Sequence, residues 1–246
     1  MRGTLPAPTG RAPSNLRAVD ARSWAEAPPV ANPWFSWSYV EANRADIAEA
    51  LGQHLTLTVQ AVLVAFAVAL PLAALVHGRP RLAAAVLGVS GVLYTVPSVA
   101  LFAILAPFTG IGRTTVLIGL VGYALLVLVR HVLVGLEGVD PGVVDAARGL
   151  GYGRMRMLVT VELPNALPSV VVGLRLATVT TVALVTIGVV VGYGGLGQLM
   201  YRGFNSAYRA EIVTATVLCL VIAFAADLLL ALAGRLATPW AAGRRS

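Results

Sequence analysis

Long stretches without charged residues are the feature that most restricts how this chain can fold. Residues 55–76 contain no acidic or basic side chain, and as a helix they are long enough to cross the hydrocarbon core of a bilayer. Apolar stretches of similar length, with at most isolated charges, occupy 82–107, 114–136, 167–191 and 212–236. Only 12% of the residues are charged, against about 25% in soluble domains. The sequence therefore predicts an all-α, polytopic membrane protein.

The second apolar stretch carries Pro97 near its middle. A proline inside a helix removes a backbone hydrogen bond and clashes with the preceding turn. Residues 82–107 therefore form either one kinked span or two shorter helices broken near Val96 and Ser98. The first arrangement gives five membrane-spanning helices and the second gives six.

The two ends of the chain differ in composition from the apolar stretches. Residues 1–33 are rich in Pro, Ala and Arg, which predicts a disordered tail. Residues 34–53 begin with a cluster of aromatic side chains. Because Trp and Tyr concentrate at the membrane–water boundary, we expect an interfacial helix there, with a loop as the alternative. The spans then fill residues 54–236, and residues 237–246 form a C-terminal tail.

Arginines in the short connections indicate the orientation of the spans, because cytoplasmic loops of membrane proteins carry an excess of basic residues. With five spans, one side holds eight of the loop and tail arginines and the other side holds four. The eight are Arg79, Arg81, Arg148, Arg154, Arg156, Arg235, Arg244 and Arg245, and the four are Arg44, Arg113, Arg202 and Arg209. We therefore expect the polar segment 139–164 and the C-terminus in the cytoplasm, and the N-terminus outside.

The net charge of +7 does not by itself indicate nucleic acid as a partner. The arginines are scattered among apolar stretches and form no basic patch with interleaved aromatic residues, so we expect no nucleic-acid binding. Membrane lipid with anionic headgroups is the expected partner of this charge. His54, His77 and His131 lie far apart, and the single cysteine, Cys219, lies in an apolar stretch. No spacing typical of a metal site occurs, so we expect no bound metal.

The polar connection 139–164 begins with the signals of a short helix. Asp140 is a favourable N-cap, and Pro141 suits the first helical position. Glycine adopts the left-handed conformation that ends many helices, so this helix should end at Gly149 or Gly151.

A second short helix is expected over residues 152–162, and Leu163 and Pro164 should end it. Two short helices joined at a glycine and held outside the bilayer form a compact knob. The small side chains of Ala146 and Ala147 let another surface approach the backbone of this knob closely.

The spacing within this connection resembles the EAA loop of ABC-importer permeases. That pattern is Glu-Ala-Ala, three residues, Gly, nine residues, Ile, one residue and Leu-Pro. The matching residues are Asp145, Ala146, Ala147, Gly151, Val161, Leu163 and Pro164. Every spacing agrees, and the two departures, Asp145 for Glu and Val161 for Ile, are conservative.

The resemblance implies a type I ABC-importer permease fold, whose loop forms coupling helices that dock in a cleft of the ATP-hydrolysing subunit. It assigns four residues to the docking surface and two to the end of the helix, namely Asp145, Ala146, Ala147 and Gly151, then Leu163 and Pro164. The implied partners are ABC ATPase subunits, a second copy or a homologous permease, and an extracytoplasmic substrate-binding protein. The sequence has no P-loop and no Lys, so we expect ATP on the partner, and neither a cofactor nor enzymatic activity on this chain.

Three further segments, 95–112, 135–151 and 192–204, resemble permeases for quaternary-amine osmoprotectants such as glycine betaine, carnitine, choline and proline betaine. Importers of methionine or another small solute share parts of these segments and remain an alternative. A membrane-embedded enzyme and a secondary transporter are more distant alternatives. Residues 192–197 fit the GxGxxG pattern, but a membrane span precedes them, so we interpret these glycines as a tight turn and not as a dinucleotide site.

Five residues in or beside the spans are candidates for the substrate pathway: Tyr94, Pro97, Tyr123, Arg175 and Asp227. Aromatic faces hold quaternary ammonium groups, which favours the two tyrosines, with core packing as the alternative. Charges inside spans are costly and often functional. Arg175 and Asp227 therefore either line the pathway or pair between helices, and Arg175 could instead extend toward lipid headgroups.

Overall fold

The computed structural model describes residues 32–240, and within them the chain is helical throughout, with no strand. The described residues from 33 to 240 belong to one compact unit, which is the part considered below. Most of the expected disordered tail, and residues 241–246, lie outside the described residues. The elements are α2 Trp37–Ala42, α3 Arg44–Val76, α4 Pro80–Thr95, α5 Ser98–Thr109, α6 Arg113–Glu137, α7 Pro141–Gly149, α8 Arg154–Met157, η1 Leu158–Glu162, α9 Leu163–Ile187, η2 Gly188–Val191, α10 Leu196–Asn205 and α11 Arg209–Ala237.

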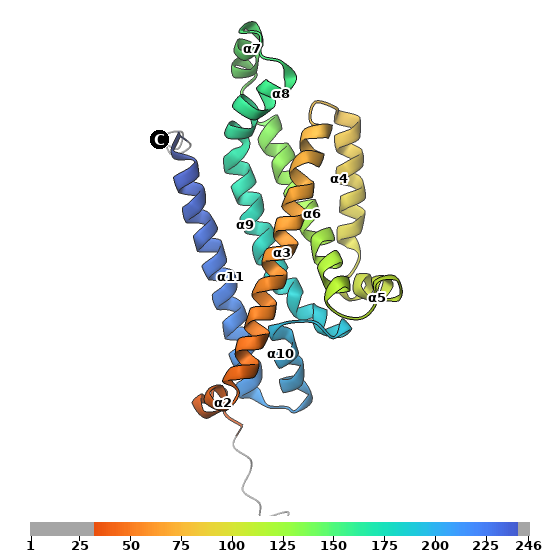
Figure 1. Cartoon of the computed structure of the whole chain (residues 1–246), viewed down its shortest axis with the longest axis vertical. Helices are drawn as coiled ribbons and strands as arrows, with labels where there is room; N and C mark the ends of the chain where they lie inside the picture. Colours follow the sequence, from red (N-terminus) through yellow and green to blue (C-terminus); the bar gives the residue numbers. More distant parts are fainter. Residues whose placement is uncertain (1–31, 241–246) are drawn as a thin grey trace, which may run out of the picture. The chain divides into compact units, whose positions relative to one another are not determined.

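Four helical segments of the described chain are long and apolar enough to cross a membrane. They are α3, α6, the continuous run Arg154–Val191 that contains α9, and α11. Helices α4 and α5 reach this length and hydropathy only together, so they make a fifth span if the bent pair counts as one. Figure 1 shows α7 and α8 at one end of this bundle and α2 and α10 at the opposite end.

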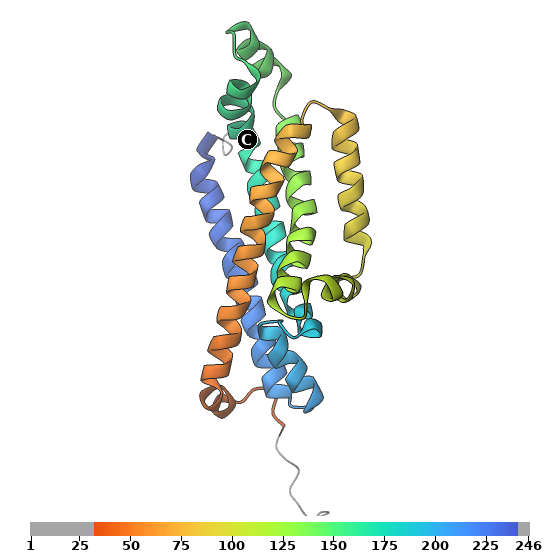
Figure 2. The same cartoon turned by 45° about the vertical axis from the view of Figure 1, so that its right-hand side comes forward.

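The second apolar stretch is two helices, not one kinked helix. Helices α4 and α5 meet at Val96 and Pro97 with a bend of 97° (Figures 1 and 2). Val96 is extended, as the residue before a proline tends to be. Its carbonyl oxygen accepts a hydrogen bond from the Tyr123 hydroxyl of α6. The proline therefore breaks the helix, and α6 holds the broken end.

The first span begins earlier than the charge pattern indicates. The expectation of one interfacial helix over 34–53 is wrong, because α2 is short and α3 runs unbroken from Arg44 through the expected boundary. Ile47, Ala50 and His54 are buried and continue the inward face of the span. One buried face is enough to extend the helix, while polar residues occupy its other side.

Helices α6 and α9 form a close pair because small residues lie where they cross. A Cβ atom at Gly135 of α6 would lie 2.8 Å from the Ala166 carbonyl oxygen of α9. A Cβ atom at Gly173 of α9 would lie 2.5 Å from the His131 Cβ of α6. Lipid gives no hydrophobic drive to helix pairing, so close backbone contact is what stabilises this pair.

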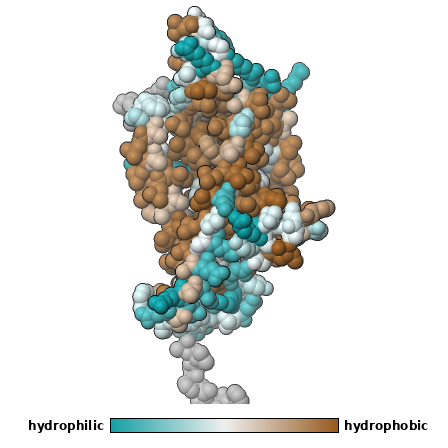
Figure 3. Space-filling view, viewed as in Figure 1, coloured by the Kyte–Doolittle hydropathy of each residue, from teal (hydrophilic) through white to brown (hydrophobic). Residues whose placement is uncertain are grey.

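The surface matches a protein held in lipid. Figure 3 shows apolar side chains around the middle of the bundle and polar side chains gathered at its two ends. One polar end carries α7 and α8, and the other carries α2 and α10. The two ends are therefore the surfaces on which water-soluble partners can act.

Replacing Gly173 with Ala should destabilise the bundle, because the added methyl group forces α9 away from His131. We expect a loss of about 1–3 kcal/mol, as for an overpacked core, measured as a lower thermal unfolding temperature of the purified full chain. Gly122→Ala in α6 is the matched control, since nothing lies within 4 Å of a Cβ atom there. Equal unfolding temperatures for the two variants would contradict the close crossing.

Candidate functional site

The polar connection starts with α7, whose ends are held by the residues that the sequence indicates. The Asp140 side chain accepts a hydrogen bond of 2.7 Å from the Gly142 amide, and Pro141 is in the first turn. Gly151 has a φ of +80°, and the Tyr152 amide bonds back to the Ala147 carbonyl at 3.1 Å. This six-residue closure is a common helix end that requires a left-handed residue. The first half of the predicted knob is therefore correct.

The second half differs from the prediction, because Leu163 and Pro164 do not end a helix. Helix α8 passes through the π-helical turn η1 into α9 without a break. The π-helical turn widens the helix just before Pro164, so the proline is accommodated within a continuous helix. Helix α8 is thus an extension of a membrane-crossing helix, and α7 is joined to it by the turn at 151–153.

The residues assigned to docking do not all face outward. Asp145 is exposed and forms an ion pair of 3.1 Å with Arg148, which is exposed too. Ala146 is exposed, whereas Ala147 is buried. Leu150, a large apolar side chain with three quarters of its surface exposed, was not singled out from the sequence. An exposed apolar side chain beside a charged pair suits a docking surface for another protein.

Three of the pathway candidates meet where α4 breaks. The Tyr94 and Tyr123 rings pack edge to face, with centroids 5.8 Å apart. Pro97 begins α5 beside them, and the Tyr123 hydroxyl is bound to Val96 as described above. Tyr94 remains about half exposed, so its ring has a free surface.

The other two candidates pair with each other. The Arg175 Nε and Nη2 atoms of α9 donate to the two carboxylate oxygens of Asp227 of α11, each at 2.8 Å. The side chains are 36% and 33% exposed, and Phe224 lines the hollows on either side of them. Of the alternatives that the sequence left open, pairing between helices is the one observed.

A second charged cluster lies at the α10 end of the bundle, and no pattern in the sequence indicates it. Arg202 of α10 hydrogen-bonds to the buried carboxylate of Glu211 in α11 and forms an ion pair of 3.1 Å with Asp46 in α3. The bond with Glu211 raises the pKa of the Arg202 guanidinium, and burial raises the pKa of the nearby Tyr39 hydroxyl. The cluster joins α10 and α11 to α3, although Asp46 of α3 lies 156 positions away from Arg202 in the chain.

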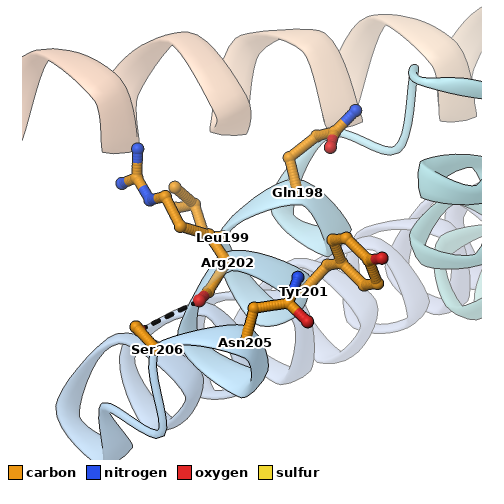
Figure 4. A pocket seen from close by; sticks show the side chains of 6 residues that line it. All are labelled: Gln198, Leu199, Tyr201, Arg202, Asn205 and Ser206. Carbon is orange, nitrogen blue, oxygen red and sulfur yellow. Dashed lines mark hydrogen bonds between the residues drawn. The ribbon is translucent and has the colours of Figure 1, made fainter. Parts of the chain in front are cut away.

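The GxGxxG segment is the turn that leads into α10. Gly195 has a φ of +54°, and its amide donates to the Gln53 side chain of α3 at 2.8 Å. A Cβ atom there would lie 2.8 Å from the His54 Cβ, so the glycine serves close packing. Beyond this turn, α10 presents Gln198, Tyr201 and other polar side chains to an open hollow (Figure 4).

Comparison with known proteins identifies the family of this chain. Residues 61–241, well over half of the chain, match the family described as the binding-protein-dependent transport system inner membrane component. The chain belongs to this family. Members of this family are transport components of the inner membrane. This is the class of protein that the spacing in the connection 139–164 indicates.

Several curated permeases are similar over most of their length. The carnitine transport permease protein OpuCB of Listeria monocytogenes is 38% identical over 178 residues, covering 70% of this chain and 81% of that protein. The osmoprotectant import permease protein OsmW of Salmonella typhimurium is 35% identical, covering 74% and 88%. The choline transport system permease protein OpuBD of Bacillus subtilis is 32% identical over 203 residues, covering 82% and 90%.

Solved structures agree on the fold of this permease. An inward-facing structure of the MetNI methionine ABC transporter superposes with a TM-score of 0.72 at 25% identity, covering 77% of this chain and 94% of the other. A structure of an amino acid ABC transporter with histidines has a TM-score of 0.66 at 19% identity, covering 80% and 96%. The second likeness concerns the fold alone.

Replacing Arg202 with Gln should weaken the α10 end of the bundle, because it leaves the buried Glu211 carboxylate without its charged partner. We expect a loss of about 2 kcal/mol in thermal unfolding of the purified permease. Asp46→Asn removes only the exposed half of the cluster and should cost about 0–1 kcal/mol. The assignment fails if the two variants unfold at the same temperature.

Replacing Asp227 with Asn should lower the yield and unfolding temperature of the permease, because it leaves a guanidinium unpaired at membrane depth. The exchange variant, Arg175→Asp combined with Asp227→Arg, restores the pair and should recover both. An exchange variant no more stable than Asp227→Asn would show that the pair does not join α9 to α11.

Proposed function

We propose that this permease imports quaternary-amine osmoprotectants such as glycine betaine, carnitine, choline or proline betaine across the cytoplasmic membrane. The observation that carries the substrate class is the similarity to carnitine, choline and osmoprotectant permeases along most of their length. ATP binds to separate ABC ATPase subunits, and this chain supplies the membrane pathway without a cofactor of its own. An extracytoplasmic binding protein delivers the substrate.

A methionine importer is the second candidate, and the structural likeness to a methionine transporter favours it. Uptake of labelled glycine betaine, carnitine, choline and methionine by cells that produce the complete transporter separates the two proposals. We expect uptake of at least one quaternary amine and no uptake of methionine. Methionine uptake alone would overturn the substrate class.

We further propose an orientation with α7 and the C-terminus in the cytoplasm and the N-terminus outside, supported by the distribution of arginines. The ATPase subunits then dock on α7 around Asp145, Ala146 and Gly151. Leu150 adds an exposed apolar contact there. Because α8 continues into α9, closure of the ATPase subunits would move α9 directly.

The exposed apolar side chains of helix α11 favour a second permease subunit, or lipid, as the neighbour of this helix. Few of its residues are buried, and large apolar side chains are exposed along its length: Val217, Leu220, Val221, Phe224, Leu228, Leu229, Leu232 and Leu236. In a membrane such a face is covered either by acyl chains or by another helix. The proposed assembly pairs this permease with a second copy or a homologous chain.

The tyrosine pair at the α4 break is the proposed contact for the substrate's ammonium group. The half-exposed Tyr94 ring offers the aromatic face that quaternary ammonium ions prefer, and Tyr123 and Pro97 hold it in position. The ion pair of Arg175 and Asp227 holds α11 in register against α9. We assign this pair a structural, supporting role beside the pathway.

Replacing Gly151 with Val should uncouple the permease from its ATPase. A β-branched residue is strained at a φ of +80°, so the end of α7 must rearrange although there is room for the side chain. We expect loss of ATPase co-purification, or a fall in osmoprotectant uptake to background with the complex still assembled.

Gly149→Ala is the matched control, because Gly149 lies in α7 with a helical conformation and open space around it. That variant should assemble and transport normally. Unchanged assembly and uptake in Gly151→Val would count against docking at this loop.

A further inference from the structure

A basic hollow lies at the α7 and α8 end of the bundle, next to the proposed docking surface and apart from the tyrosine pair. Its volume is about 380 Å³, and it lies between the turn that follows α3 and the start of α8. The polar side chains that line it are those of His77, Arg79, Arg148, Tyr152, Arg154 and Glu162. Two chain segments that are distant in sequence, 74–79 and 148–162, therefore contribute to one cavity.

Positive charge dominates this cavity. Three arginines line it, and Glu162 is the one carboxylate among the lining residues. That carboxylate lies 3.4 Å from the Nε2 atom of His77, so it faces the imidazole. Arg148 is paired with Asp145 on the exposed side of α7. The remaining guanidinium groups have no carboxylate of the cavity to neutralise them.

Donor groups in the cavity lack acceptors. Within residues 32–240, neither Arg79 nor Arg154 forms an ion pair. Both guanidinium groups are exposed side chains that line the cavity, so they are the donors that a ligand accepting hydrogen bonds would meet there.

We propose that this cavity binds a phosphate-bearing anion, either the headgroup of an acidic phospholipid or a soluble phosphate. Guanidinium groups bind phosphate through charge-assisted and often paired hydrogen bonds. His77 directly follows Val76, the last residue of α3, so the cavity lies where a membrane-crossing helix ends. Basic pockets at this level between membrane helices are typical sites for acidic headgroups.

The bound anion would connect the two parts of the permease that the cavity separates. Arg79 belongs to the turn between α3 and α4, whereas Arg154 begins the helix that continues into α9. An anion bound by both would join the first span to the base of the coupling loop. This role does not depend on which solute the permease carries.

The test uses the full chain in nanodiscs of neutral phosphatidylcholine. Thermal unfolding is followed while inorganic phosphate is added against sodium chloride of equal ionic strength, and then in nanodiscs that contain phosphatidylglycerol. A ligand that binds only the folded state raises the unfolding temperature. Native mass spectrometry counts the phosphatidylglycerol molecules that remain bound.

Arg154→Gln and Arg79→Gln each remove one cavity guanidinium, and Arg156→Gln is the matched control. Arg156 lies on the same short helix as Arg154, but its guanidinium stacks over the Tyr152 ring at 4.1 Å and does not line the cavity. Each cavity variant should weaken the apparent affinity about tenfold, the effect of losing one charge-assisted hydrogen bond. The control should bind as the natural chain does.

The pattern of responses decides the proposal. Stabilisation by phosphatidylglycerol alone supports a lipid headgroup, and stabilisation by inorganic phosphate as well supports recognition of the phosphate group itself. The proposal is overturned if neither ligand stabilises the natural chain beyond sodium chloride. It is equally overturned if Arg156→Gln weakens binding as much as the two cavity variants do. The weaker binding would then come from the lower positive charge of this end of the permease and not from a defined site.

Discussion

The close crossing of α6 and α9 is the contact on which the rest of the permease depends. Two helices in lipid gain little from hydrophobic burial against each other, so their association requires backbones that come close enough for dense van der Waals contact. Gly135 and Gly173 permit that approach at two levels of the crossing. A hydrogen bond of 2.8 Å from the Ser169 hydroxyl to the His131 carbonyl adds a polar contact between them. Every other span then packs against a pair that is already fixed.

Two pairs of opposite charges connect helices of the bundle. Arg175 and Asp227 neutralise each other where α9 meets α11, and Arg202 neutralises Glu211 at the α10 end. Both pairs join α11 to a neighbouring helix, and α11 has the smallest buried share of the four long spans. Paired charges therefore supply specific contacts for a helix with little buried surface, which is consistent with the restriction of charged residues in membranes to satisfied positions.

Local signals in the sequence were sufficient for the ends of α7 and for the position of the interruption at Pro97, because capping and proline geometry depend on neighbouring residues only. They did not decide between a kink and a break at Pro97. The fold class followed from the apolar stretches and the loop spacing. The cluster of Arg202, Glu211 and Asp46 could not be predicted, since 156 positions separate Arg202 from Asp46 and nothing in either segment indicates the other. The pairing of Arg175 with Asp227 was one alternative among several for the same reason. Which helix faces meet is decided by packing, and a single sequence does not contain that information in a readable form.

The error at Leu163 and Pro164 is the most instructive one, because it changes the mechanics of coupling. A proline at the end of a short helix would leave α7 and α8 as a separate knob, connected to the membrane by a flexible joint. The π-helical turn at 158–162 instead accommodates the proline that follows it, so α8, η1 and α9 form one continuous helix. A displacement of α8 would therefore be transmitted along one helix into α9, whereas α7 is joined to α8 through the non-helical turn at 151–153. Since α9 is packed closely on α6, a displacement of α9 would move α6 with it.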